Sequence, residues 1–123
     1  MREIKFRSFH SGRGMIYDVH KFWSSHGESF GHVIEDSHHL VMQYTGLRDK
    51  NGREIYEGDI TQHGIRRSII EWRDYHSGFV AIAKMHRSVP VEGIEDPIYA
   101  ELIEVIGNIY ENPELLSDSK ETC

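Results

Sequence analysis

The chain has 123 residues and a net charge of −6, and 38% of its residues are hydrophobic; this length and composition suit a single folded domain. The one cysteine, Cys123, excludes an intramolecular disulfide and favours a reducing compartment. No apolar run approaches the roughly 18 residues of a membrane span, and residues 1–7 contain no apolar export segment. We therefore expect a cytoplasmic protein that does not associate with membranes.

The N-terminal part of the chain predicts a β-hairpin. Residues 2–9 alternate, with Ile4 and Phe6 on one side and charged residues such as Arg7 on the other. This alternation is typical of a strand with one buried face. A glycine-containing turn and the apolar residues 15–19 then complete the hairpin.

The middle of the chain predicts short strands joined by tight turns. Residues 40–45 read as a buried strand, and Asn51-Gly52 readily takes the positive φ angles that tight turns require. Gly58-Asp59 is a similar step, in which the Asp59 carboxylate is expected to bond nearby amides.

The second half predicts more strands. Residues 67–72 and 79–83 favour an antiparallel hairpin, and residues 102–110 complete the set. Only residues 85–89 and 111–116 are interpreted as helical turns. Short strands at near-regular spacing favour an antiparallel barrel or sandwich over parallel α/β architecture.

We therefore predict an all-β fold in a single domain over residues 1–123. The predicted parts are an N-terminal β-hairpin extension at residues 1–45, an antiparallel SH3-like small barrel at residues 46–110, and a short C-terminal helical turn and tail at residues 111–123. No internal repeat or long linker divides the chain.

Three ordered segments, residues 1–7, 42–60 and 106–116, resemble the YopX family of bacteriophage and prophage proteins. The pairs Glu71-Trp72 and Gly78-Phe79 also resemble that family's pattern. The resemblance implies a small β-rich, phage-encoded protein with no catalytic residue or ligand that can be transferred. Interpreted as architecture, the signature and the turn motifs place structural turns at Gly46, Asn51, Gly52, Gly58, Asp59 and Gly107.

Metal binding is one hypothesis, because the chain contains nine histidines. His20, His26, His32 and His38 recur at intervals of six residues, which in a strand span roughly 20 Å, too far for one metal ion. His38 and His39, beside Glu35 and Asp36, form the best candidate ligand pair. Exposed loop histidines are the simpler interpretation, and we expect no cofactor.

Catalysis is a second hypothesis, for which Glu57 and Asp59, the two acids that flank the turn glycine Gly58, are the candidate pair. An Asp in this setting usually caps backbone amides. The terminal Cys123 is an improbable nucleophile, and no Gly-x-Ser-x-Gly motif occurs. We therefore favour a non-catalytic protein.

Nucleic-acid binding is a third hypothesis, since small barrels often stack bases on aromatic side chains beside basic ones. The densest basic and aromatic cluster consists of Arg66, Arg67, Trp72, Arg73 and Tyr75. In the alternative interpretation Trp72 packs in the core and the arginines solvate an edge. The overall negative charge argues against a nucleic-acid interface that covers the whole surface.

Protein association is the hypothesis we prefer. Open β edges can pair between copies of a chain, and the partner is then a second copy or an unknown host or phage protein. Residues 92–123 contain nine acidic residues and one basic residue, Lys120. We interpret this acidic segment mainly as a solvated terminal region, and alternatively as a docking element together with Leu115-Leu116.

Overall fold

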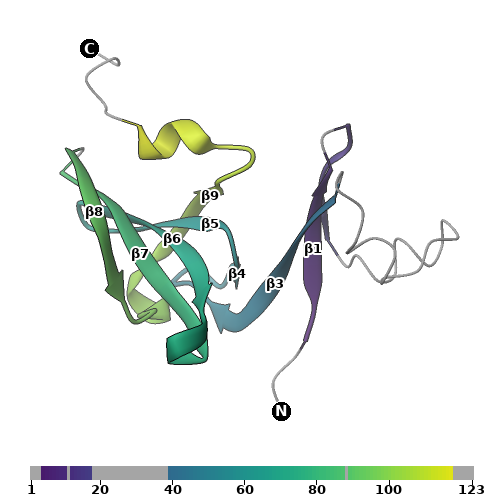
Figure 1. The fold of residues 1–123 in the computed structure, drawn as a ribbon, viewed down its shortest axis with the longest axis horizontal. Helices are drawn as coiled ribbons and strands as arrows, with labels where there is room; N and C mark the ends of the chain where they lie inside the picture. The colour runs from purple at the N-terminus through teal and green to yellow at the C-terminus, as the bar shows by residue number, and fades with distance from the viewer. Residues whose placement is uncertain (1–3, 11, 18–38, 88, 118–123) are drawn as a thin grey trace, which may run out of the picture.

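The computed structural model describes residues 4–10, 12–17, 39–87 and 89–117, which form short strands and three 3-10 helical turns (Figure 1). The strands are β1 (Phe6–His10), β2 (Gly14–Tyr17), β3 (His39–Arg48), β4 (Glu54–Tyr56), β5 (Asp59–His63), β6 (Arg66–Arg73), β7 (Gly78–His86), β8 (Val89–Asp96) and β9 (Glu104–Asn108). The helical turns are η1 (Asp74–His76), η2 (Ala100–Leu102) and η3 (Pro113–Leu116). Within these ranges, no helix has the length and apolar character needed to cross a bilayer.

The strands form two antiparallel sheets. One sheet has the order β2-β1-β3-β4, and the other has the order β8-β7-β6-β5-β9. Figure 1 shows the five-stranded sheet curling into a half-barrel, with the β1–β2 hairpin standing beside it. The predicted all-β antiparallel small barrel, with its N-terminal hairpin and its C-terminal helical turn at η3, is confirmed.

Strand β3 belongs to both parts of the molecule. Its first half pairs with β1, from His39 opposite His10 to Gln43 opposite Phe6. Its second half pairs with β4, with Tyr44 opposite Tyr56 and Arg48 opposite Glu54. The register shifts between these two pairs, and there Gly46 has a φ of +89°. The predicted division after residue 45 therefore falls inside one continuous strand, and Gly46 lies in a bulged strand rather than a turn.

The hydrophobic core contains residues of both sheets. Its buried members come from β4, β6, β7 and β9 and from the residue before β9, and they are Ile55, Ile70, Ala81, Ile103 and Val105. Phe79, Ile98 and Ala100 pack against them. Each fully buried aliphatic side chain stabilises the fold by about 1.5–3 kcal/mol. The family resemblance also implies core positions at Tyr44, Ile55, Tyr56, Ile60, Ile106 and Ile109; the first four are buried, and Ile106 and Ile109 are half-buried.

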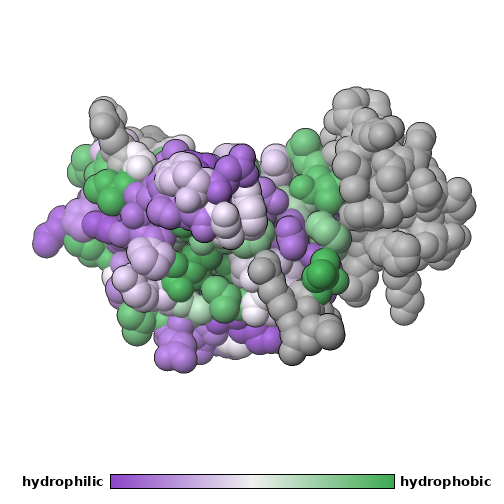
Figure 2. Space-filling view, turned by 60° about the horizontal axis from the view of Figure 1, so that its bottom comes forward, coloured by the Kyte–Doolittle hydropathy of each residue, from purple (hydrophilic) through white to green (hydrophobic). Residues whose placement is uncertain are grey.

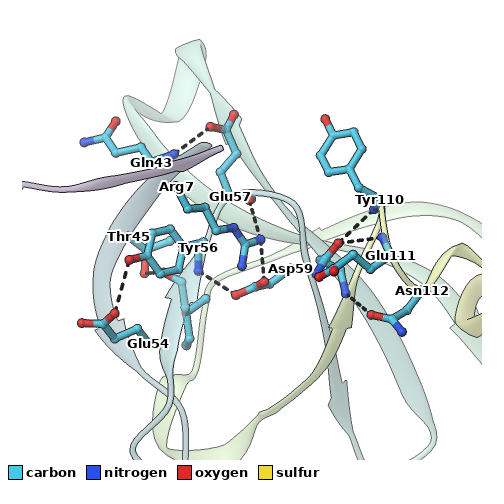
Figure 3. A network of polar contacts seen from close by, with 12 residues as sticks. Arg7, Gln43, Thr45, Glu54, Tyr56, Glu57, Asp59, Tyr110, Glu111 and Asn112 are labelled. Atoms are coloured by element: carbon cyan, nitrogen blue, oxygen red, sulfur yellow. Dashed lines mark hydrogen bonds and ion pairs between the residues drawn. The ribbon is translucent and has the colours of Figure 1, made fainter. Parts of the chain in front are cut away.

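A buried ion pair joins the hairpin to the barrel (Figure 3). The Arg7 Nη2 lies 2.7 Å from Asp59 Oδ1, and both side chains are only 1% exposed. The same nitrogen donates to the Glu57 carbonyl at 3.2 Å, and the guanidinium stacks 4.7 Å from the Tyr56 ring. The sequence-based expectation that Arg7 lies on the solvent side and Ile4 on the buried side was wrong, since Ile4 is 71% exposed. A paired guanidinium over an aromatic ring is stable in the interior.

The turn between β3 and β4 is organised by Asp49. Its Oδ1 accepts bonds from the amides of Asn51 and Arg53, each at 2.9 Å, and its Oδ2 accepts from the Val105 amide at 2.8 Å. Burial acts to raise the pKa of this carboxyl, but the bonds from the Val105, Arg53 and Asn51 amides outweigh it and lower the pKa below 3.8. Asp49 therefore ties the turn to β9.

Three glycines illustrate two different requirements. Gly52 and Gly58 have φ angles of +84° and +87°, which favour glycine. A Cβ at Gly58 would also lie 3.0 Å from Met42 Sδ. Gly107 lies inside β9 rather than at the expected turn, and there a Cβ would lie 2.6 Å from Asn112 Oδ1. Gly107 is thus required for space and not for its φ angle.

The expected helical turn at residues 85–89 was wrong. Met85 and His86 end β7, Arg87 turns the chain with a φ of +56°, and Val89 begins β8. Strand β8 itself was not predicted. Met85 is buried and pairs with Pro90 across the sheet, so the cross-strand contacts outweigh any local helical preference.

Candidate functional site

A groove of about 630 Å³ lies where the end of β3, the start of β7 and the end of β8 meet. Figure 2 turns this end of the molecule towards the viewer and shows hydrophobic residues emerging between hydrophilic ones. The groove is lined by residues 45–47, 78–80 and 95–98 and by His76. It is larger than the cavity of about 340 Å³ that is lined by Thr61, Ser68 and Tyr99.

The floor of the groove is apolar and firmly packed. Phe79 and Ile98 pack against the hydrophobic core, and Leu47 lies 40% exposed beside them. On its other side Phe79 meets Trp72 edge to face, with the ring centroids 5.2 Å apart. An apolar surface held in this way needs little reorganisation when it covers a ligand.

Glu95 organises one rim of the groove. It accepts hydrogen bonds from Tyr75 Oη and, at 3.2 Å, from Arg73 Nε, and His76 Nε2 lies 3.2 Å from its Oε1. The bond from Tyr75 lowers the pKa of Glu95, and the same bond raises the pKa of Tyr75. Arg73 also bonds Glu71 Oε1 at 2.8 Å. The rim is therefore a network of opposite charges.

The other predicted nucleic-acid residues also have partners. Arg66 Nη1 lies 2.6 Å from Asp96 Oδ2, and the indole nitrogen of Trp72 donates to Asp74 Oδ1 at 2.6 Å. Arg67 lies apart from the groove, where it donates to Gln62 Oε1 and to the Leu115 carbonyl, which anchors η3. The sequence suggested a single cluster. The structure instead places Arg67 beside Gln62 and η3, and the other four residues beside the carboxylates of Asp74, Glu95 and Asp96.

The rim of the groove contains more negatively charged than positively charged side chains. The network contains two arginines, Arg66 and Arg73, and four acidic residues, Glu71, Asp74, Glu95 and Asp96, so the carboxylates outnumber the guanidinium groups by two. The expectation of a mainly solvated acidic segment missed Glu95 and Asp96, which pair with the basic cluster. Their strand was not predicted, so the sequence carried no signal for the contact.

The candidate metal ligands were His38 and His39. His38 lies outside the described residues, and the backbone of His39 begins β3. Within the part of the chain that the structure describes, no three His, Cys, Asp or Glu side chains are grouped to hold a metal ion.

Glu57 and Asp59, the carboxylate pair of the catalytic hypothesis, accept hydrogen bonds from different backbone amides. Glu57 Oε1 accepts from the Gln43 amide at 3.4 Å, and Asp59 Oδ2 accepts from the Tyr56 amide at 2.7 Å. Burial raises the pKa of Asp59, against the opposing effect of Arg7. Asp59 thus bonds an amide near its turn, as expected, and it also contacts Arg7, which the sequence did not indicate.

Comparison with known proteins gives a family and a fold. A family model described as "YopX protein" matches residues 5–117. A crystal structure of protein EF1440 from Enterococcus faecalis is similar with a TM-score of 0.51 and 24% identity, over 95% of this chain and 100% of that one. That likeness bears on the fold alone. No curated protein matches the chain.

Proposed function

We propose that this chain, which belongs to the YopX protein family, is a non-catalytic module that binds a segment of a partner protein in the groove beside Leu47 and Phe79. The observation that carries the proposal is an apolar groove of about 630 Å³ with a charged rim. Volumes of about 300–1,000 Å³ with mostly apolar lining are usual for ligand sites. A peptide side chain fits such a space.

The chemistry of the partner follows from the two parts of the groove. Leu47, Phe79 and Ile98 provide an apolar surface for a large aliphatic or aromatic side chain. The carboxylates in excess around Glu95 and Asp96 favour a neighbouring lysine or arginine. The segment we infer therefore combines an apolar anchor with an adjacent basic residue.

The setting we propose is the cytoplasm of a bacterium that carries a phage or prophage, with a host or phage protein as the partner. This rests on the resemblance to a phage-associated family. Pairing of two copies through an edge strand is a second route to assembly, since β8 has one neighbour in the described sheet. Light scattering at increasing concentration tests that route, and a constant monomer mass would exclude it.

Nucleic-acid binding through Arg66, Arg67, Trp72, Arg73 and Tyr75 remains the alternative proposal. The ion pairs of Arg66 with Asp96 and of Arg73 with Glu95 weaken it, because phosphate would have to compete with these carboxylates. We therefore rank it below the protein-binding proposal.

The test is selection from a random peptide library displayed on phage, with the wild-type protein, Leu47→Glu and Val89→Glu as targets. Leu47 is in the groove, whereas Val89 is 58% exposed at the other end of β8 and serves as the matched control. We expect enriched peptides with an apolar residue beside Lys or Arg, bound by the wild type and V89E but not by L47E.

Two outcomes would overturn the proposal. One is the absence of any enriched peptide, and the other is binding that L47E leaves unchanged. Fluorescence anisotropy with single- and double-stranded oligonucleotides at low salt runs alongside. Binding there that weakens steeply with salt, without selected peptides, would support the nucleic-acid alternative instead.

A further inference from the structure

A second cavity of about 340 Å³ is lined by residues of β5, β6 and β7, by the end of β8 and by the segment that follows it. The strand register explains its lining, because directly paired residues of antiparallel strands point to the same side of a sheet. Thr61 pairs with Ser68, His63 pairs with Arg66, and Arg66 also pairs with His86. Five polar side chains from three strands thus share one face, and all five line the cavity.

Several of these polar groups lack hydrogen-bond partners among the residues that the structure describes. The Thr61 and Ser68 side chains are 2% and 6% exposed, and no hydrogen bond to either hydroxyl is found within the described ranges. His86 Nδ1 is buried and has no hydrogen-bond partner among the described residues. Buried polar groups in folded proteins are nearly always hydrogen bonded. The Thr61 and Ser68 hydroxyls, each of which can donate and accept, are therefore suited to a ligand that both donates and accepts.

Apart from Asp96, the rest of the cavity is apolar and includes a flat aromatic ring. Ala81 and Ile103 form its inner wall, and Pro97 and Tyr99 form its outer edge. The Tyr99 side chain is 55% exposed, which leaves ring surface for stacking. An aromatic face beside groups that donate and accept hydrogen bonds suits a planar heterocycle, since base-to-aromatic stacking is favourable for any base.

Charge restricts the ligand further. The positive charge of Arg66 is countered by Asp96 at 2.6 Å, so the cavity has no free cation among its described lining residues. A phosphate group would meet the Asp96 carboxylate without a compensating charge. An uncharged ligand is therefore favoured over a nucleotide.

We propose that this cavity binds a small uncharged heterocycle of the nucleobase or nucleoside class. The hydroxyls of Thr61 and Ser68 bond the polar edge of the ring, Tyr99 stacks on its face, and His86 forms part of the wall. The cavity is at the small end of the usual range for ligand sites, as expected for a ligand of this size. This cavity adjoins the groove of the proposed function, with which it shares Asp96 and Pro97, but its binding side chains Thr61, Ser68 and Tyr99 do not line the groove, so the proposal does not depend on that function.

The test is isothermal titration calorimetry of the full chain with adenosine, guanosine, cytidine, uridine and thymidine, each followed by its 5′-monophosphate. The variants are Tyr99→Ala and Ser68→Val, and Leu47→Glu in the groove is the control. We expect at least one nucleoside to bind, Y99A to weaken it about tenfold through the lost stack, and L47E to leave it unchanged. The monophosphate should bind no more tightly than the nucleoside.

Tyr99 is exposed, so Y99A keeps the test valid if S68V fails to fold. Absence of heat with all five nucleosides up to their solubility would overturn the proposal, as would Y99A binding as tightly as the wild type. Tighter binding of monophosphates, or binding of short oligonucleotides without nucleosides, would also contradict it. Failure of the peptide selection with success here would reject the proposed function alone.

Discussion

Arg7 and Asp59 are separated by 52 positions in the sequence, yet the Arg7 Nη2 lies 2.7 Å from Asp59 Oδ1 in the interior of the protein. The pair joins β1 of the hairpin to β5 of the half-barrel. Because both side chains are removed from solvent, neither charge can be left alone without a large cost. The contact therefore couples the folding of the two parts.

Arg7→Met should destabilise the protein by about 3–5 kcal/mol, since it leaves the Asp59 carboxylate buried without its counter-charge. Urea denaturation followed by circular dichroism measures the change. Asp59→Asn is the partner variant, and Arg7→Met/Asp59→Asn should be less destabilised than the sum of the two single variants. Strict additivity would show that the two residues do not interact energetically.

Asp49→Asn should lower the free energy of unfolding by about 1.5–3 kcal/mol at neutral pH, because an amide cannot accept all three backbone bonds that the carboxylate accepts. The folded-state pKa of Asp49 lies below 3.8. Its stabilisation is therefore present above the unfolded pKa and is lost as the pH falls through the folded pKa.

Urea midpoints of the wild type and D49N at several pH values between neutral and strongly acidic conditions check this dependence. The difference between the two proteins should be constant at neutral pH and shrink as the carboxyl becomes protonated. A difference that stays the same at every pH would mean that the charge of Asp49 contributes nothing.

Gly58→Ala should destabilise the protein more than Gly52→Ala. Both positions have similar positive φ angles, so both variants carry a backbone strain of about 1–2 kcal/mol. Only at Gly58 does the new Cβ approach another side chain, Met42, whereas nothing lies within 4 Å of a Cβ at Gly52. Thermal unfolding of the two variants isolates the steric contribution, and equal melting temperatures would contradict it.

The Glu95→Gln variant should lower the pKa of Tyr75. In the wild type the bond to Glu95 holds the Tyr75 pKa above its ordinary value of 10.0, because ionising the phenol would place two negative charges together. Absorbance titration of tyrosinate measures it, with Tyr75→Phe subtracted to isolate this residue from the five other tyrosines. An identical Tyr75 titration in the wild type and E95Q would exclude the contact in solution.

Local sequence chemistry predicted most of the architecture. Asn51-Gly52 and Gly58-Asp59 specify their turns through short-range geometry, and alternation identified most of the strands. Arg7 could not be placed in this way, because its burial depends on Asp59 and Tyr56, which are distant in sequence. Asp49 had a local signal, since an Asp two residues before a turn Asn commonly bonds its amide.

The candidate sites depended on contacts that no local pattern reveals. In the sequence alone, Arg66 and Arg73 indicate an exposed basic cluster. In the structure their charges are paired with the carboxylates of Asp96 and Glu95. That pairing requires β8, which its proline and glycine obscured in the sequence. The cavity beside Thr61 and Ser68 depends similarly on strand register.

Strand β3 hydrogen bonds to the hairpin along its first half and to β4 along its second half. A force that pulls the hairpin away from the half-barrel is therefore carried through the covalent backbone of β3 and not only across a packed interface. Separation of the hairpin from the half-barrel requires both breaking the strand pairing of β3 and extracting Arg7 from its contact with Asp59. A partner that exerts tension on one part would thus transmit it mechanically to the other.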